Sequence, residues 1–369
     1  MKKFLILTLF ISAAIFSASA KPPKISIDKD EELYYFPSYI AYNKKNDLFH
    51  IKIHAWVCEP EFDSTARKMI TAAAKKHMNL SDDDLENKTF NERFRLFMID
   101  QESRKSISAL IGTSYYNIGV TDANGHTERE IVLPSNIFYS IIKYSGNTIP
   151  EEAEVSFTSE AKSDDRIFEG KAKLIKPEGI MVITDIDDTI KISEVYDKSK
   201  LLRNVFVNEY KPVPKMQKLL NSWKNKGADF TYLTSSPWQL FPAIQSFITK
   251  EKFPEGLIQM KSFGLKDGYL SIFESPEKFK TPIILRIMKD FPDKKFIFIG
   301  DSFEKDPEIY ADIARKNPGR IPHIFIRNTS AESRDSDRMK KAFDKIDQSS
   351  WSLFSDPSEI ENLSDNLFR

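Results

Sequence analysis

Two carboxylate side chains, Asp185 and Asp187, follow an apolar run in the segment ITDIDDT. Because side chains two residues apart project to the same side of an extended chain, both can reach one substrate. One carboxylate can attack phosphorus and form an aspartyl-phosphate, while the other donates a proton to the leaving oxygen and then activates water. The pair is therefore compatible with hydrolysis of a phosphomonoester or with a cation site alone.

This chemistry requires a cation, because two neighbouring anions would repel a phosphate group. Mg²⁺ suits a site made of oxygen ligands, which Asp185, Asp301 in the segment GDSFEKD and the backbone carbonyl of Asp187 can supply. Asp306 closes the same segment and can either lie beside the metal and orient Lys280 or cap the following helix. The predicted cofactor is Mg²⁺, and the predicted metal group is Asp185, Asp187, Asp301 and Asp306.

Three further side chains can supply the hydrogen-bond donors that phosphate oxygens require. Thr234 and Ser235 follow the apolar run over residues 230–233, and Lys280 comes just before an expected helix start. Both hydroxyls come directly after the run, so the sequence leaves open which of them faces the phosphate. The predicted catalytic group is Asp185, Asp187, Thr234, Ser235 and Lys280.

Short apolar runs that alternate with amphipathic helices indicate how these residues are brought together. Strands are expected over residues 180–183, 230–233, 295–299 and 323–326, and helices over 214–225, 237–250, 281–289 and 307–315. This alternation predicts an open α/β fold, a parallel sheet with helices on both faces. In such sheets the active site lies beyond the carboxyl ends of the strands, where the candidate residues stand.

The chain before this α/β region has the pattern of strands. Apolar and polar residues alternate over 49–57, and similar stretches occur at 93–100, 114–121, 127–133 and 154–158. A helix is expected over 63–77. Several short strands at this spacing predict a β-sandwich-like domain. The expected organisation is a signal peptide (1–20), a β-rich domain (21–176), the α/β domain (177–330) and a polar, partly helical C-terminal extension (331–369).

The composition limits the classes of partner and predicts export. Lys plus Arg and Asp plus Glu number 54 each, so nothing indicates a nucleic-acid-binding protein. Lys2 and Lys3, an apolar run over residues 4–16 and the small residues 18–20 form the pattern of a cleavable secretory signal, which predicts a periplasmic or secreted protein. Cys58 is the only cysteine, so no internal disulfide can form.

The ordered segments DIDDT, the hydroxyl pair, Lys280 and GDSFEKD resemble the four motifs of the haloacid dehalogenase superfamily. More narrowly, GIMVITDIDDTIK, LTSSPWQLF and FPDKKFIFIGDSFEKDPEIYADI resemble the catalytic domain of the actin-patch-associated phosphatidate phosphatases over about residues 176–328. The resemblance implies a haloacid-dehalogenase-like fold with Asp185 as nucleophile, Asp187 as acid/base and Lys280 as the phosphate-neutralising lysine. Asp301 is then a magnesium ligand. Phe279 and Phe303 depart from the pattern, where relatives often have His and Gly.

The connections after the first two α/β strands are too short for a large cap domain, so we expect an open crevice that admits a phosphate on a lipid or a protein. Trp238 and Phe241 can contact an acyl chain or, alternatively, belong to a helix core. The leading hypothesis, taken from the resemblance, is hydrolysis of phosphatidate to diacylglycerol with peripheral membrane contact. The alternatives are an extracytoplasmic phosphatase for a soluble or protein phosphomonoester, and a binding protein with a vestigial phosphatase domain. The sequence does not indicate an oligomeric state.

Overall fold

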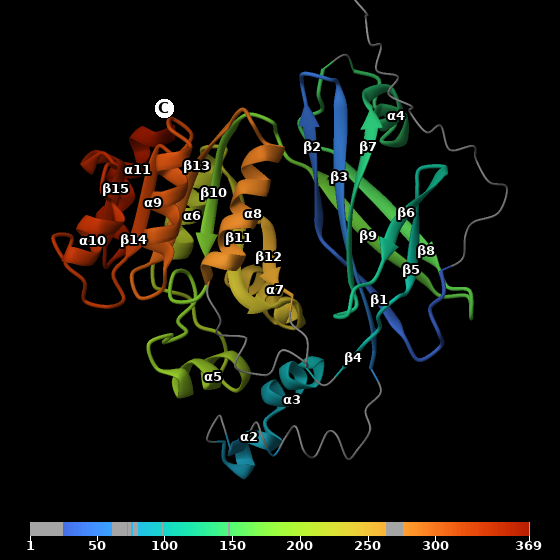
Figure 1. The fold of residues 1–369 in the computed structure, drawn as a ribbon, viewed down its shortest axis with the longest axis horizontal. Helices are drawn as coiled ribbons and strands as arrows, with labels where there is room; N and C mark the ends of the chain where they lie inside the picture. The colour runs from blue at the N-terminus through green and yellow to red at the C-terminus, as the bar shows by residue number, and fades with distance from the viewer. Residues whose placement is uncertain are drawn as a thin grey trace, which may run out of the picture.

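The computed structural model describes residues 25–60, 72, 75–76, 80–97, 99–146, 148–262 and 276–368. Within them, a nine-stranded sheet in the N-terminal part stands beside a six-stranded sheet in the C-terminal part (Figure 1). The predicted signal peptide and most of the predicted helix over 63–77 lie outside the described residues. Among the described helices, none combines the length and apolar character that crossing a bilayer requires.

The six-stranded sheet is parallel throughout, as the alternation of apolar runs and helices predicted. Its strand order is β12-β11-β10-β13-β14-β15, so the strand that ends at Asp185 is in the interior of the sheet. The strands are β10 (Gly179–Asp185), β11 (Asp229–Pro237), β12 (Leu257–Lys261), β13 (Lys294–Asp301), β14 (His323–Arg327) and β15 (Trp351–Phe354).

Helices cover both faces of this sheet, because alternate residues of each buried strand point to opposite sides. Val182 and Ile297 belong to one hydrophobic core, and Met181 and Phe296 belong to another. The first core takes in α5 (Lys198–Phe206), α6 (Met216–Asn225) and α7 (Phe241–Lys250), and the second takes in α8 (Pro276–Asp290), α9 (Asp306–Lys316) and α10 (Asp337–Ala342). The mixed α/β architecture with a parallel sheet is therefore confirmed.

Three elements differ from the sequence-based expectations. The helix expected over 281–289 begins at Pro276, so Lys280 lies inside α8 rather than before it. The strand expected over 93–100 is wrong, because α3 (Lys88–Phe94) and a 3₁₀ turn (Arg95–Phe97) occupy most of it. Residues 331–369, expected to form an extension, contribute α10 and the edge strand β15 to the α/β region.

The N-terminal strands form one hydrogen-bonded network centred on β3, which pairs with four others, so a division into two packed sheets stays a prediction. Cys58 is buried at the end of β3 and is free. The strands are β1 (Glu32–Phe36), β2 (Ser38–Asn43), β3 (Leu48–Glu59), β4 (Asp100–Gln101), β5 (Ser106–Ile111), β6 (Ser114–Val120), β7 (His126–Pro134), β8 (Glu154–Glu160) and β9 (Ile167–Leu174).

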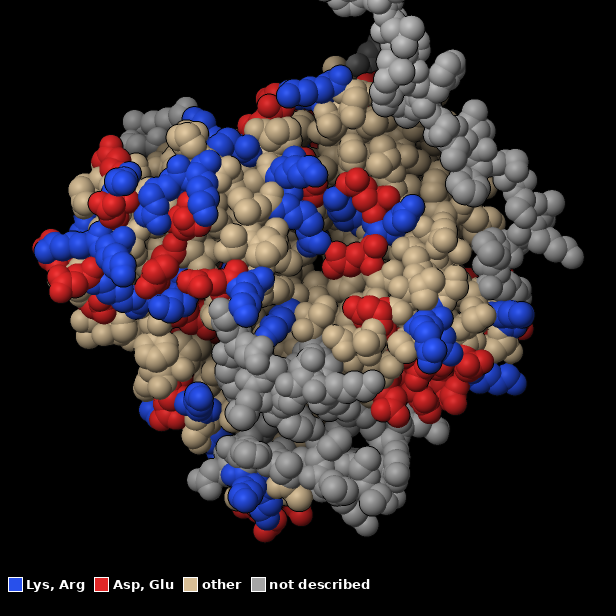
Figure 2. Space-filling view, viewed as in Figure 1, with Lys and Arg blue, Asp and Glu red and all other residues tan. Residues whose placement is uncertain are grey.

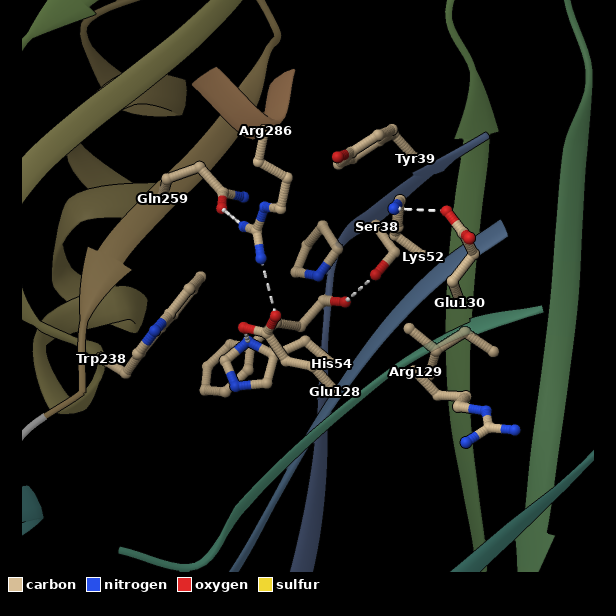
Figure 3. Close-up of a pocket in the computed structure, with 13 residues that line it drawn as sticks. Ser38, Tyr39, Lys52, His54, Glu128, Arg129, Glu130, Trp238, Gln259 and Arg286 are labelled. Carbon is tan, nitrogen blue, oxygen red and sulfur yellow. Dashed lines mark hydrogen bonds and ion pairs between the residues drawn. The ribbon is translucent and has the colours of Figure 1, made fainter. Parts of the chain in front are cut away.

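The two parts share a packed interface with a cavity of about 180 Å³ (Figure 3). The Arg286 guanidinium of α8 lies 2.8 Å from the Glu128 carboxylate of β7, and the Phe36 and Trp238 ring centroids are 4.3 Å apart. Figure 2 shows acidic and basic side chains gathered around the hollow between the parts. Apolar packing and ion pairs therefore hold the two sheets together.

We predict that Trp351→Ala, in the edge strand β15, strongly destabilises the protein. The Trp351 ring is buried and stacks on Phe343 with ring centroids 3.9 Å apart. Its removal leaves a cavity and should lower the free energy of unfolding, measured in urea, by about 3–5 kcal/mol. Leu363→Ala, at a side chain that is 41% exposed, is the control and should change it by less than about 0.5 kcal/mol. Equal effects would show that β15 lies outside the cooperative core.

Candidate active site

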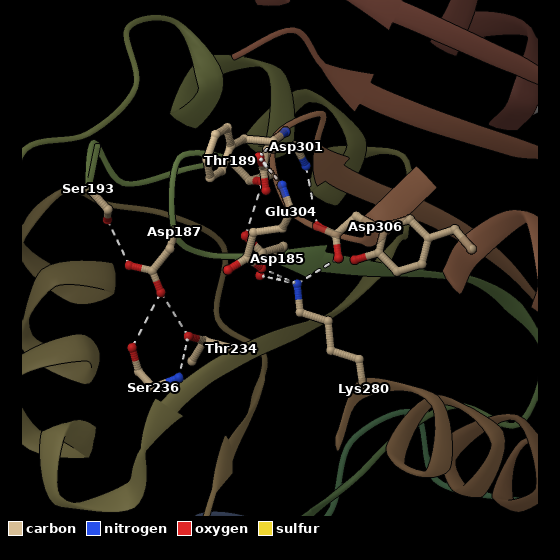
Figure 4. A network of polar contacts seen from close by, with 12 residues as sticks. Asp185, Asp187, Thr189, Ser193, Thr234, Ser236, Lys280, Asp301, Glu304 and Asp306 are labelled. Carbon is tan, nitrogen blue, oxygen red and sulfur yellow. Dashed lines mark hydrogen bonds and ion pairs between the residues drawn. The ribbon is translucent and has the colours of Figure 1, made fainter. Parts of the chain in front are cut away.

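The carboxyl ends of β10, β11 and β13 bring the predicted residues to one edge of the parallel sheet (Figure 4). Asp185 is the last residue of β10 and Asp301 the last of β13, while Thr234 lies in β11 just after Leu233, the residue paired with Asp185. All three side chains are buried. The expected convergence of the strand ends is confirmed.

The lysine of the site, Lys280, is fully buried and reaches the strand ends from α8. Its Nζ lies 2.8 Å from Asp185 Oδ1, 3.0 Å from Glu304 Oε2 and 2.6 Å from Asp306 Oδ1. Burial disfavours the ammonium, but the Asp185 and Asp306 carboxylates outweigh this effect and raise the pKa of Lys280. The side chain is therefore held charged and in a fixed position against Asp185.

Four carboxylates crowd around this single ammonium. Asp185, Asp301, Glu304 and Asp306 each place an oxygen within 4.8 Å of the others. Asp301 Oδ1 accepts hydrogen bonds from the Phe303 amide (2.7 Å) and the Thr329 hydroxyl (3.0 Å), but Asp301 Oδ2 is buried and has no partner among the described residues. Burial and the neighbouring carboxylates raise the pKa of Asp301 to about 8. Four clustered carboxyl groups around one ammonium, with one unpaired ligand atom, fit a divalent cation.

The sequence left open whether Asp306 orients Lys280 or caps the following helix, and the contacts of its side chain distinguish the two. Its Oδ1 contacts Lys280, and its Oδ2 accepts a hydrogen bond from the Asp301 amide at 3.3 Å. It is the first residue of α9 rather than the residue that caps the helix. The Asp306 side chain therefore orients the lysine and the end of β13. Glu304, which the sequence reasoning missed, contacts the same lysine; its acidic type and its place between Asp301 and Asp306 were the available signal.

Asp187 belongs to a separate network, although it is only two residues from Asp185. Its Oδ1 lies 2.7 Å from both the Lys191 ammonium and the Ser193 hydroxyl, and its Oδ2 accepts hydrogen bonds from Thr234 (2.9 Å) and Ser236 (3.3 Å). Burial would raise its pKa, but Lys191 and these hydrogen bonds hold the pKa of Asp187 at about 2. Its carboxylate is outside the four-carboxylate group, and a metal contact through its backbone carbonyl stays a prediction.

The structure distinguishes the two hydroxyls that follow β11 Leu233. Thr234 is buried and bonds to Asp187, whereas the buried Ser235 hydroxyl has no partner among the described residues. Ser236, which was not predicted, contacts Asp187 and donates its amide to the Thr234 hydroxyl at 3.0 Å. The contact with Asp187 therefore involves Thr234 and Ser236 rather than Ser235. The run of three hydroxyl-type residues was too uniform for the sequence to show which of them face inward.

The loop after the motif is organised by Asp188, a residue with no predicted role. Asp188 Oδ1 accepts hydrogen bonds from the amides of Ser193 (2.7 Å) and Glu194 (2.9 Å), and Oδ2 accepts one from the Val195 amide (2.7 Å). Its own backbone is left-handed, with φ of 53°. One carboxylate thus fixes the backbone over residues 193–195 and places Ser193 against Asp187.

The two aromatic residues predicted to contact substrate do not line this site. Trp238 is 5% and Phe241 is 8% exposed, and both rings pack on Phe36 of β1, with centroids 4.3 and 5.2 Å apart. This packing buries them between the two parts of the chain. This packing agrees with the alternative that the two rings belong to a core, although that core includes Phe36 of β1 as well as the helix; contact with a substrate stays a prediction.

Comparison with known proteins shows which family part of this chain is similar to. Residues 180–328 match the family described as "Phosphatidate phosphatase APP1, catalytic domain". Phosphatidate phosphatase APP1 of Saccharomyces cerevisiae is 30% identical over 274 residues, which cover 70% of this chain and 43% of that protein. The matched residues contain every strand end and acidic side chain of the site.

Other similarities are more limited. An uncharacterized protein of Schizosaccharomyces pombe is 28% identical over 184 residues, covering 47% of this chain and 29% of that protein. A solved structure of the Pnkp1/Rnl/Hen1 complex contains a chain that is 15% identical with a TM-score of 0.31, covering 40% of this chain and 46% of that one, too low to support an argument. The chain spans less than half the length of the curated relatives it matches.

The raised pKa of Asp301 predicts how stability depends on pH when divalent cations are removed. An unfolded aspartate loses its proton near pH 4, whereas folded Asp301 keeps it until about pH 8. Its contribution to stability is therefore fully present below about pH 4 and is lost as the pH rises through about 8. Urea unfolding of the wild type and Asp301→Asn in chelator, between pH 5 and 9, should show a steeper decline for the wild type. If the free energy of unfolding falls equally with pH in both proteins, the raised pKa assigned to Asp301 is wrong.

Proposed function

Because residues 180–328 match the family of APP1 catalytic domains, we propose that this chain hydrolyses phosphomonoesters with Asp185 as the nucleophile. The observation that carries the proposal is the buried Asp185–Lys280 pair, at 2.8 Å, beside the unpaired Asp301 Oδ2. The pair fixes the attacking group, and the excess of carboxylates provides for a cation. We further propose the haloacid-dehalogenase-like fold for residues 177–330.

Asp301, whose Oδ2 has no partner among the described residues, and Asp185 would hold Mg²⁺. Both oxygens of Asp306 are already engaged, by Lys280 and by the Asp301 amide. The cation, when bound, supplies positive charge that offsets the charge of the phosphate and the carboxylates. Lys280 then adds a second positive charge on the side of α8. Together they allow an anionic substrate to approach an anionic nucleophile.

An oxygen of Asp185 attacks phosphorus, the ester P–O bond breaks, and Asp187 donates a proton to the leaving oxygen. Asp187 then takes a proton from water, whose oxygen attacks the aspartyl-phosphate; inorganic phosphate leaves and Asp185 is restored. Asp187 starts ionised, with a pKa of about 2. The negative charge of a phosphate beside it raises this pKa and favours the protonated form that the first step uses.

The proposed substrate is phosphatidate, which gives diacylglycerol and phosphate. The name of the Saccharomyces cerevisiae relative and the short connections of the α/β region support it, since β10 and α6 are joined through α5 alone among the helices. The signal predicted over residues 1–20 would place the activity outside the cytoplasm. A location outside the cytoplasm also favours a second candidate function, a phosphatase for soluble or protein phosphomonoesters in that compartment.

Asp185→Asn tests the nucleophile. The amide keeps the shape of the side chain but cannot attack phosphorus, so phosphate release should fall by about 10⁴-fold or more. Asp312→Asn, at an exposed carboxylate of α9, is the matched control and should keep its rate within about twofold. If purified Asp185→Asn still releases phosphate at the wild-type rate, the assignment is wrong.

Phosphate release from phosphatidate vesicles and from soluble p-nitrophenyl phosphate, with Mg²⁺ and with chelator, tests the substrate and the cofactor. We expect kcat/KM to be at least about tenfold higher for phosphatidate, because binding of the diacylglycerol part contributes to transition-state stabilisation. Chelator should abolish both activities. Turnover of the soluble ester alone would favour the second candidate, and turnover that survives chelation would exclude the magnesium assignment.

A further inference from the structure

We infer that the site is bordered by an apolar rim, formed by Ile192, Tyr196 and Phe303, that docks on the surface of an anionic lipid bilayer. This inference rests on the proposed function, because it states how a phosphate carried in a membrane reaches Asp185. The rim residues come from the two segments that follow the motif carboxylates of β10 and β13. None of them takes part in the proposed reaction.

The rim side chains are exposed although they adjoin buried site residues. Ile192 is 37%, Tyr196 is 53% and Phe303 is 44% exposed. Ile192 stands between Lys191 and Ser193, which are buried against Asp187, so it projects the opposite way. Single exposed apolar residues are ordinary, but several at the mouth of one site mark an interaction surface.

Two segments that are far apart in the sequence meet in the rim. The Tyr196 and Phe303 rings are 6.4 Å apart between centroids, in an edge-to-face arrangement. Tyr196 also has a polar tip, because its hydroxyl donates to Glu194 at 2.8 Å. An aromatic ring with a polar tip is suited to the boundary between lipid headgroups and acyl chains.

The site carboxylates fix the backbone that carries the rim. Asp188 binds the amides over residues 193–195, between Ile192 and Tyr196. Asp301 Oδ1 binds the Phe303 amide at 2.7 Å. The apolar side chains are therefore held at a fixed position relative to the catalytic carboxylates, as docking before phosphate transfer requires.

Two exposed lysines flank the rim and identify its partner as anionic. The Ile192 amide donates to the Lys211 carbonyl at 2.9 Å, which makes the two residues cross-strand neighbours on one face. Lys198 begins α5, two residues after Tyr196. Neither lysine has an ion-pair partner among the described residues. Apolar side chains beside uncompensated cations match a bilayer with anionic headgroups.

Vesicle binding measured in the Asp185→Asn background tests the rim without turnover. Sedimentation measures how much protein binds to phosphatidylcholine vesicles with and without phosphatidate. The proteins compared are Asp185→Asn alone and Asp185→Asn combined with Ile192→Ser, Tyr196→Ser and Phe303→Ser. The rim substitutions should weaken binding to the phosphatidate vesicles by at least about tenfold. Val120→Ser and Ile167→Ser, at residues 57% and 59% exposed on the N-terminal sheet, should leave binding unchanged. Equal binding of all variants would overturn the inference.

A second variant guards against misfolding of the triple variant. Phe303→Trp in the otherwise native chain should shift tryptophan emission to the blue when phosphatidate vesicles are added, relative to the wild type. No shift would overturn the rim, and so would a concentration-dependent dimer of the native chain that the rim substitutions abolish, because a second copy would then be the partner. Rim-dependent binding without phosphate release would keep the rim and reject the proposed substrate.

Discussion

The site depends on the ion pairs between the buried Lys280 ammonium and the carboxylates around it. This ammonium joins α8 to the ends of β10 and β13 through Asp185, Glu304 and Asp306. A buried ion pair that loses its lysine leaves uncompensated charge, which costs about 3–5 kcal/mol. One ammonium cannot balance four carboxylates, so the arrangement stays electrostatically incomplete until further positive charge arrives. The incomplete balance supports the proposal that the site binds a cation.

Asp185 and Asp187 illustrate how neighbouring carboxylates are separated into different roles. Burial raises the pKa of Asp185, against the lowering effect of Lys280. Lys191 and the hydroxyl groups of Ser193 and Thr234 lower the pKa of Asp187 and hold it ionised. The N-terminal part also lies close to Lys191. The Lys191 ammonium and the Arg93 guanidinium of α3 both lie over the ring of Tyr210. The N-terminal part thereby contributes to the surroundings of Asp187.

Sequence patterns predicted the parallel sheet and the strand-end residues well, because a buried strand is a continuous apolar run followed by polar residues, as at Asp185 and Asp301. They failed where tertiary contacts decide the outcome. The alternation over residues 93–97 suggested a strand, yet Phe94 and Phe97 pack on Phe206 from a helix and a 3₁₀ turn. Trp238 looked like a substrate contact because only the folded chain brings Phe36 against it. Glu304 and Lys191 were missed for the same reason.

The position of β15 has a consequence for how the protein is made. The central strand β10 begins at Gly179, but the core of the same sheet includes Trp351, near the end of the chain. The α/β region therefore cannot complete its core until Trp351 has left the ribosome, and domains of this size fold as units. This half of the molecule therefore stays incompletely packed while residues 179–350 are being synthesised.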